Sequence, residues 1–170
     1  MMNRLIDDPN VWEAARKVRL LLMDCDGVLT DGRLYFGESG EALKVFDVQD
    51  GLGIVRWHRE GNHSGIITGR SSPIVDKRAA ELGMQYVVQG SKDKLWDARA
   101  ICDELGFGFS ETAYIGDDLP DIDLIEAVGL GVATSNAVEP VKAAANYVTS
   151  NPGGRGAVRE VIELLIASRD

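Results

Sequence analysis

The sequence predicts a three-layer α/β/α sandwich, a Rossmann-like core in which helices cover both faces of a parallel central sheet. Short runs of β-branched and apolar residues alternate along the chain with amphipathic stretches of helical length. The earliest run, "VRLLLMD", is apolar almost throughout, which is typical of a strand buried on both faces. The length of 170 residues predicts a single domain, spanning residues 1–170, around a full hydrophobic core.

The first half of the chain supplies three strands, two helices and a flap. Gly61 and Gly83 end the two helices in the C′ position, and a serine cap followed by Pro73 begins the second. "RLYFGESGEALKVF" reads as a β-hairpin flap, because two short strand-like runs flank a polar turn that contains glycine. The predicted order is a strand over 18–24, the hairpin over 33–46, a helix over 50–61, a strand over 64–70, a helix over 71–83 and a strand over 85–90.

The second half continues the same alternation to the end of the chain. A helix is predicted over 91–106 and a strand over 112–118, and the segments 120–129, 130–135, 137–146 and 147–150 continue the pattern. The C-terminal tail and helix cover about 151–170: "NPGGRG" is a loop over 151–156, and a closing amphipathic helix spans 157–168.

Composition excludes several classes of function. The net charge of -9 argues against nucleic acid and anionic membranes as partners. No run approaches the roughly 18 apolar residues of a membrane span, and the N-terminal residues show no signal peptide. Two cysteines, Cys25 and Cys102, in a chain of this size suggest a reducing compartment rather than a disulfide framework. We therefore expect a cytoplasmic protein.

Polar groups are concentrated where predicted strands end. The strand ends carry Asp24 and Asp26, Thr68 and Arg70, and Asp117 and Asp118. In parallel sheets ligands bind at the carboxyl ends of the strands, so these groups are expected on one rim. Acids this close repel one another unless a cation lies between them, and carboxylate oxygens suit Mg²⁺. Lys94 would supply a second positive centre for a phosphate group.

Four motifs in this order resemble those of the haloacid-dehalogenase-type phosphatases. "DCDGVLTDG" is similar to their DxDGxxTDG signature, "IITGR" to the second motif, the lysine of "SKDK" to the third and "GDDLPD" to the fourth. The resemblance covers nearly the whole chain. It implies phosphoryl transfer from a phosphate monoester to water.

The resemblance also implies a role for each acid. Asp24 would be the nucleophile that forms an aspartyl phosphate, and Asp26 the general acid and base. Mg²⁺ would be held by the Asp24 carboxylate, the Asp26 backbone carbonyl and Asp117, with Asp118 and Asp121 in support and Asp118 preferred of the two. Thr68 and Lys94 complete the predicted catalytic set, in contact with the phosphate.

The motif spacing leaves no room for the cap domain of larger family members. The small, capless type that remains resembles the 3-deoxy-manno-octulosonate 8-phosphate phosphatases, both in "FDVQDGLGI" after the hairpin and in "NPGGRGAVREV". This likeness implies a homotetramer in which adjacent subunits cover the site, and a phosphorylated 2-keto-3-deoxy sugar acid as substrate. The implied substrate contacts are Thr30, Gly69, Arg70, Arg78 and Arg155.

Three alternatives stay open at this point. Phosphatases of nine-carbon sugar-acid 9-phosphates share almost every quoted motif. A non-catalytic oligomerisation module of the same fold would lack Asp24 or Asp26, and this sequence has both. A phosphoacceptor receiver domain shares the acidic strand ends, the threonine and the lysine, but lacks an acid two residues after the nucleophile.

Overall fold

The computed structural model describes residues 8–169, and its centre is a six-stranded parallel sheet in the order β5-β4-β1-β6-β7-β8. The prediction that the N-terminal residues form no signal peptide concerns residues that lie largely outside this range. Strands numbered after β1 are added on both sides of it, as the predicted alternation of strands and helices requires. The sheet strands are β1 (Leu20–Met23), β4 (His63–Thr68), β5 (Tyr86–Gln89), β6 (Thr112–Gly116), β7 (Leu130–Ala133) and β8 (Tyr147–Val148).

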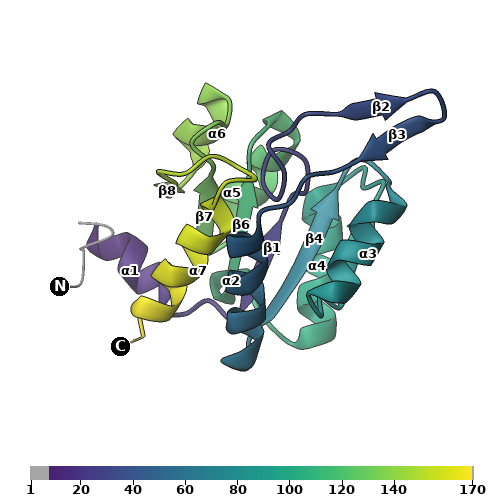
Figure 1. Ribbon diagram of the computed structural model, residues 1–170. Coiled ribbons are helices and arrows are strands. Elements are labelled where there is room, and N and C mark those ends of the chain that lie inside the picture. Colours follow the sequence, from purple (N-terminus) through teal and green to yellow (C-terminus); the bar gives the residue numbers. More distant parts are fainter. Residues whose placement is uncertain (1–7, 170) are drawn as a thin grey trace.

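Helices cover both faces of the sheet, as predicted (Figure 1). Successive side chains of a strand point to opposite faces, so Leu21 and Met23 enter one core while Leu20 and Leu22 enter the other. The first core receives α1 (Pro9–Ala15), α2 (Val48–Arg59), α3 (Pro73–Glu81) and α7 (Ala157–Ala167). The second receives α4 (Lys94–Leu105), α5 (Ile122–Ala127) and α6 (Glu139–Ala144).

The predicted hairpin forms a separate two-stranded sheet of β2 (Tyr35–Gly37) and β3 (Gly40–Leu43). It projects from the end of the molecule at which β4 finishes (Figure 1). Between β1 and β4 the chain forms only this hairpin and α2, so no cap domain is present in the described residues.

The helix caps agree with the sequence, but one helix was not predicted and several boundaries differ. Ser72 caps α3 with Pro73 in its first turn, and Gly61 and Gly83 have positive φ angles just beyond their helices. The sequence did not predict α1. The helix expected over 91–106 begins only at Lys94, because Asp93 caps it. The segment 120–129 divides into the short 3₁₀ turn η2 (Leu119–Asp121) and α5.

Candidate active site

Strand register places the predicted catalytic residues side by side. In β1, Met23 lies opposite Ile66 of β4 and Ile115 of β6. The chain leaves β1 at Asp24, while Thr68 and Asp117 follow two residues after those partners. This rim is also where the strand order changes direction, the usual ligand site of an open parallel sheet.

A cavity of about 780 Å³ opens at this rim. It is large enough for a small organic phosphate. The predicted residues that line it are Asp24, Asp26, Thr68, Gly69, Arg70, Lys94, Asp117 and Asp118. The structure therefore brings together all four residues of the predicted catalytic set.

Asp24 faces a buried lysine. Its Oδ2 lies 2.8 Å from Lys94 Nζ, and its Oδ1 accepts a hydrogen bond from the Cys25 N–H at 2.6 Å. Burial lowers the pKa of Lys94, but the carboxylates of Asp24 and Asp121 outweigh burial, and the net pKa is raised. Burial also raises the pKa of Asp24, against the opposing effect of Lys94. The lysine therefore stays charged, and it balances only part of the negative charge around it.

Asp121 is the anchor of this arrangement. It is completely buried, and one of its oxygens accepts from Lys94 Nζ at 2.6 Å and from the Tyr114 hydroxyl at 2.6 Å. Its other oxygen accepts hydrogen bonds from the backbone N–H groups of Asp117 at 2.8 Å and Asp118 at 3.1 Å. Four donors on one carboxylate fix the position of Lys94 and of the strand end that carries Asp117.

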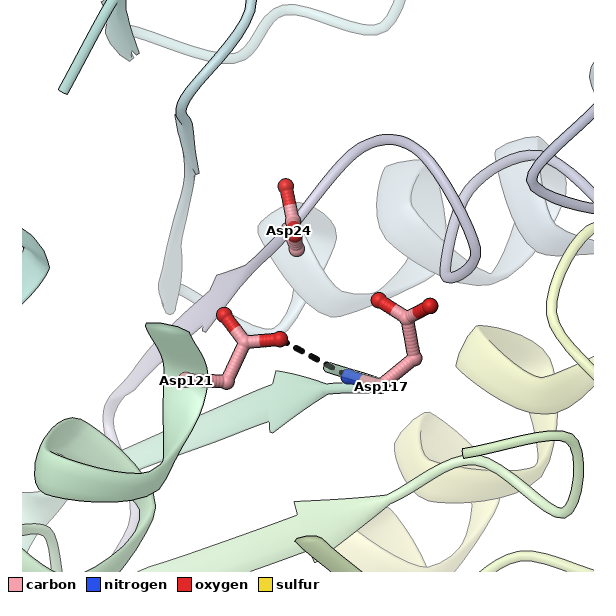
Figure 2. A group of neighbouring side chains, drawn as sticks. All are labelled: Asp24, Asp117 and Asp121. Carbon is pink, nitrogen blue, oxygen red and sulfur yellow. Dashed lines mark hydrogen bonds between the residues drawn. The ribbon is translucent and has the colours of Figure 1, made fainter. Parts of the chain in front are cut away.

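Asp117 has the features of a cation ligand. Ligand oxygens of Asp24, Asp117 and Asp121 lie within 4.8 Å of one another, and Figure 2 shows Asp24 after β1, Asp117 after β6 and Asp121 at the start of α5. Asp117 Oδ1 is buried and has no hydrogen-bond partner. Burial, reinforced by the charges of Asp24 and Asp121, raises the pKa of Asp117 to about 8. An unpartnered buried oxygen among acids fits a hard divalent cation such as Mg²⁺.

Asp26 is held by the hairpin. Lys44, directly after β3, lies 2.5 Å from Asp26 Oδ1 and 2.9 Å from Glu41 Oε1, and its side chain is only 2% exposed. Arg70 approaches the same acids, at 3.4 Å from Asp26 Oδ2 and 3.5 Å from Glu41 Oε1. The Asp26 carboxylate is thus paired with Lys44 and Arg70, whereas Asp24 is paired with Lys94.

Comparisons with known proteins agree with this geometry. Residues 82–162 match the family model described as haloacid dehalogenase-like hydrolase. The 3-deoxy-D-manno-octulosonate 8-phosphate phosphatase of Salmonella typhimurium is 43% identical over 161 residues, which cover 95% of this chain and 86% of that protein. The chain belongs to this phosphatase family.

Solved structures of the family superpose closely on the chain. One is the phosphatase from Moraxella catarrhalis in complex with magnesium, phosphate and KDO, at 42% identity and a TM-score of 0.91, covering 94% of this chain and 91% of that one. Another is the cobalt-bound phosphatase from Haemophilus influenzae, at 35% identity and a TM-score of 0.90, covering 92% and 91%. The chain thus has the fold of these phosphatases over nearly its whole length.

Three of the predicted substrate contacts do not line this cavity. Thr30 is buried, and its hydroxyl accepts from the N–H groups of Gly27 and Gly32, so it shapes the loop after β1. Arg78 pairs with Glu81 on α3 and does not line the cavity. Arg155 is exposed and is also absent from the cavity lining. Gly69 and Arg70 do line it.

The sequence predictions gave no role to three residues at the site. They also ranked Asp118 above Asp121 as the supporting acid, whereas the structure favours Asp121. Glu41 and Lys44 lie in the predicted hairpin and Tyr114 in the predicted strand over 112–118, but no role was predicted for any of them, and only the structure brings them to the site. Asp118, preferred over Asp121 as the supporting acid, is exposed and caps η2 through Leu119 N–H at 2.8 Å, whereas Asp121 is the buried anchor. A sequence signal existed for Asp121, since an acid three residues after a cap is typical of a capping box.

Proposed function

We propose that this chain is a Mg²⁺-dependent phosphomonoesterase that hydrolyses 3-deoxy-D-manno-octulosonate 8-phosphate (KDO 8-phosphate) to the free sugar acid and phosphate. The observation that carries the proposal is the contact between Asp24 and buried Lys94, beside an unpartnered Asp117 oxygen, in a member of this phosphatase family. Both cores flank a single sheet, which supports one catalytic domain over residues 1–170.

The side chains support a two-step reaction. A carboxylate oxygen of Asp24 forms a bond to phosphorus while the bond from phosphorus to the sugar oxygen breaks, and Asp26 donates its proton to that oxygen. Lys94 neutralises charge on the phosphoryl oxygens throughout. In the second step Asp26 takes a proton from water, the water oxygen bonds to phosphorus, and the phosphorus–Asp24 bond breaks.

The residues present fit Mg²⁺. Asp24 and Asp117 would hold it through their carboxylates and Asp26 through its backbone carbonyl, while Asp118 and Asp121 would support the set. When bound, Mg²⁺ supplies positive charge that neutralises the acids and the phosphate. Asp121 already accepts four hydrogen bonds, so we assign it to fixing Lys94 and Asp117 rather than to direct coordination.

A substrate panel tests the proposal. The purified protein is incubated with Mg²⁺ and either KDO 8-phosphate or nine-carbon sugar-acid 9-phosphates, and released inorganic phosphate is measured. We expect the highest kcat/KM for KDO 8-phosphate. Preference for a nine-carbon substrate would replace the proposed substrate while keeping the reaction. No release from any substrate would favour the non-catalytic module.

Mg²⁺ binding is expected to release a proton below about pH 8. A carboxyl whose pKa is raised in the folded protein holds its proton between its ordinary pKa and about 8, and a metal must displace that proton. The apparent affinity for Mg²⁺ should therefore rise with pH until it levels off near pH 8. Isothermal titration calorimetry at pH 6.5, in buffers of different ionisation enthalpy, counts the protons released.

Asp117→Asn is the matched variant for this measurement. It removes both the titrating group and a proposed ligand, so we expect weaker binding and no proton release from this position. Equal proton release by the wild type and the variant would contradict the assignment of Asp117.

We further propose a cytoplasmic homotetramer assembled through the hairpin flap. Exposed apolar side chains gather on and after the hairpin: Leu34, Phe36, Leu43, Val45 and Val48. Phe36 is 64% exposed, and such a cluster is typical of an interface. Two free buried cysteines agree with a reducing compartment. No helix in the described residues is long and apolar enough to cross a membrane.

Phe36→Asp is expected to lower the solution mass from four chains toward one. A charge at the centre of an apolar interface is desolvated without a partner, which opposes association. Light scattering coupled to size exclusion gives the mass. Val148→Asp, on exposed β8 at the far edge of the sheet, is the control and should keep four chains. A wild-type monomer would contradict the tetramer.

A further inference from the structure

Two sequence segments that the proposed reaction does not use meet in the structure. The first is "FDVQDGLGI", which begins α2, and the second is "NPGGRGAVREV", which leads into α7. Helices α2 and α7 lie side by side on one face of the sheet (Figure 1). Between them Gly53 leaves room for Arg159, because a Cβ there would lie 3.0 Å from the arginine side chain. The contact that joins the segments most directly is made by Asp50.

Asp50 of α2 caps α7 across the helix interface. The first N–H groups of a helix lack partners within the helix, and Gly156, the residue at the N-cap of α7, has no side chain to bind them. Asp50 takes that place: it accepts from Gly156 N–H at 3.3 Å and from Arg159 N–H at 2.8 Å, and it is 1% exposed. Burial raises its pKa to about 6, against the opposing effect of these N–H donors, so the carboxylate is ionised at neutral pH.

The glycine loop, defined as residues 151–156, is therefore fixed at both ends. At its far end Asp50 holds Gly156. At its near end Glu160 of α7 accepts from the backbone N–H of Asn151 at 3.0 Å and from its side chain at 2.7 Å. A loop that contains three glycines is thus held by Asp50 of α2 at one end and by Glu160 of α7 at the other.

The middle of the glycine loop rests on the Asp24 loop, defined as residues 24–31. Gly153 N–H donates to Asn136 Oδ1 at 2.6 Å, and Asn136 Nδ2 donates to the Gly27 carbonyl at 3.2 Å. Gly154 N–H donates to the Val28 carbonyl at 2.9 Å. A Cβ on Gly153 would lie only 1.8 Å from the Gly27 oxygen, so the two backbones touch.

Gly27 in turn is packed against the proposed metal ligand. A Cβ on Gly27 would lie 1.9 Å from Asp117 Oδ2, and this glycine has a φ of +89°. Its position is thus set from one side by Asn136 and from the other by Asp117. A shift of Gly27 would displace the loop that carries Asp24 and Asp26 and would also disturb Asp117.

We propose that Asp50 and Asn136 are positioning residues for the phosphatase reaction. Asp50 fixes the glycine loop through the N-terminus of α7, and Asn136 transmits that position to Gly27 and so to Asp24 and Asp117. This inference rests on the proposed function, because it assigns residues that touch neither substrate nor metal to the geometry of that same site.

Asp50→Asn is the direct test. The amide has the same shape as the carboxylate, but an NH₂ group replaces one of the two oxygens. That donor would face the N–H group of Gly156 or Arg159. A shift of reacting atoms by about 1 Å costs up to about 10²-fold, so we expect kcat to fall 10- to 100-fold while KM stays within about threefold. Glu163→Gln is the matched control, because Glu163 joins Arg56 of α2 to Arg159 of α7 without touching the glycine loop. It should keep kcat within about twofold.

A second readout does not depend on activity. Arg155 is exposed within the glycine loop, so trypsin cleaves there once the loop is released. We expect the fragment ending at Arg155 to form about 10-fold faster from Asp50→Asn than from the wild type or Glu163→Gln. The activity is normalised to the folded fraction measured by circular dichroism.

Asn136→Asp gives the same test from the surface if the buried variant does not fold. Its carboxylate still accepts from Gly153 N–H but opposes the Gly27 carbonyl, so kcat should again fall with KM unchanged. Unchanged kcat per folded molecule in Asn136→Asp, or in Asp50→Asn where it folds, would overturn the inference. A wild type that hydrolyses no phosphomonoester, p-nitrophenyl phosphate included, would instead overturn the proposed function, while faster cleavage at Arg155 would still report release of the loop.

Discussion

Asp24→Asn is expected to lower kcat for KDO 8-phosphate by at least about 10⁴-fold. The amide cannot attack phosphorus as a carboxylate does, and loss of a nucleophile removes the covalent route entirely. Lys94, Asp26 and the cavity remain in place, so substrate binding should change much less than turnover. Phosphate release under saturating Mg²⁺ measures the loss. Mass spectrometry of wild type and variant, quenched during turnover, shows whether phosphate is attached to residue 24.

The same substitution should leave the fold intact or make it more stable. Burial raises the pKa of Asp24, so its charge is disfavoured in the metal-free protein, and an amide of the same shape removes that charge. We expect the melting temperature without metal to equal or exceed that of the wild type. Asp103 is an exposed acid on α4, and Asp103→Asn is the control, which should change neither kcat nor the melting temperature. Residual activity within 10-fold of the wild type would contradict the nucleophile assignment.

Residues at strand ends could be predicted because local pattern and sheet geometry determine them. A run of four fully buried residues ends at Met23, so the next residue must leave the sheet at its rim. Parallel pairing with β4 and β6 then places Thr68 and Asp117 beside it. Lys94 is the first residue of α4, the helix after β5, and this helix begins at the same rim. The fold and the grouping of these residues around one cavity could thus be predicted together.

Residues that reach the site by tertiary packing could not be predicted in this way. "GDDLPD" offers three acids, and the capping-box spacing that marks the third does not indicate that the turn buries it beside a lysine. The choice falls on Asp121 because η2 uses the Asp118 side chain as its cap and turns the later acid inward, against Lys94 and Tyr114. The glycines before Arg155 could not be explained from the sequence either, and the structure shows that Gly153 allows a close contact with the Gly27 carbonyl.

The hairpin was predicted as a flap, but its contact with the site was not. Lys44 lies beyond the second strand of the hairpin, and 18 residues separate it from Asp26. No periodicity indicates how a projecting hairpin is oriented relative to the sheet. The structure shows that Lys44, just beyond β3, contacts Asp26 and that Glu41 of β3 contacts Arg70, and both Asp26 and Arg70 line the cavity.

Lys44→Met is expected to lower kcat for KDO 8-phosphate by about 10²- to 10³-fold. The side chain is almost completely buried between Asp26 and Glu41, so its loss leaves Arg70 as the cation that both acids share. Asp26 would then turn away from the leaving group, and the contribution of general acid catalysis, typically 10² to 10⁴, would be mostly lost. The hairpin should also loosen, seen as faster amide exchange over 35–43.

The leaving group distinguishes this loss from general damage. The sugar alcohol needs a proton as it departs, whereas p-nitrophenolate is a weak base and departs without one. Lys44→Met and Asp26→Asn should therefore both slow the hydrolysis of KDO 8-phosphate far more than they slow phosphoenzyme formation from p-nitrophenyl phosphate. The burst of p-nitrophenol measures the second reaction. Lys142→Met, which breaks an exposed pair with Glu139 on α6, should slow neither. An equal loss on both substrates would show that Lys44 supports the fold of the rim rather than the orientation of the proton donor.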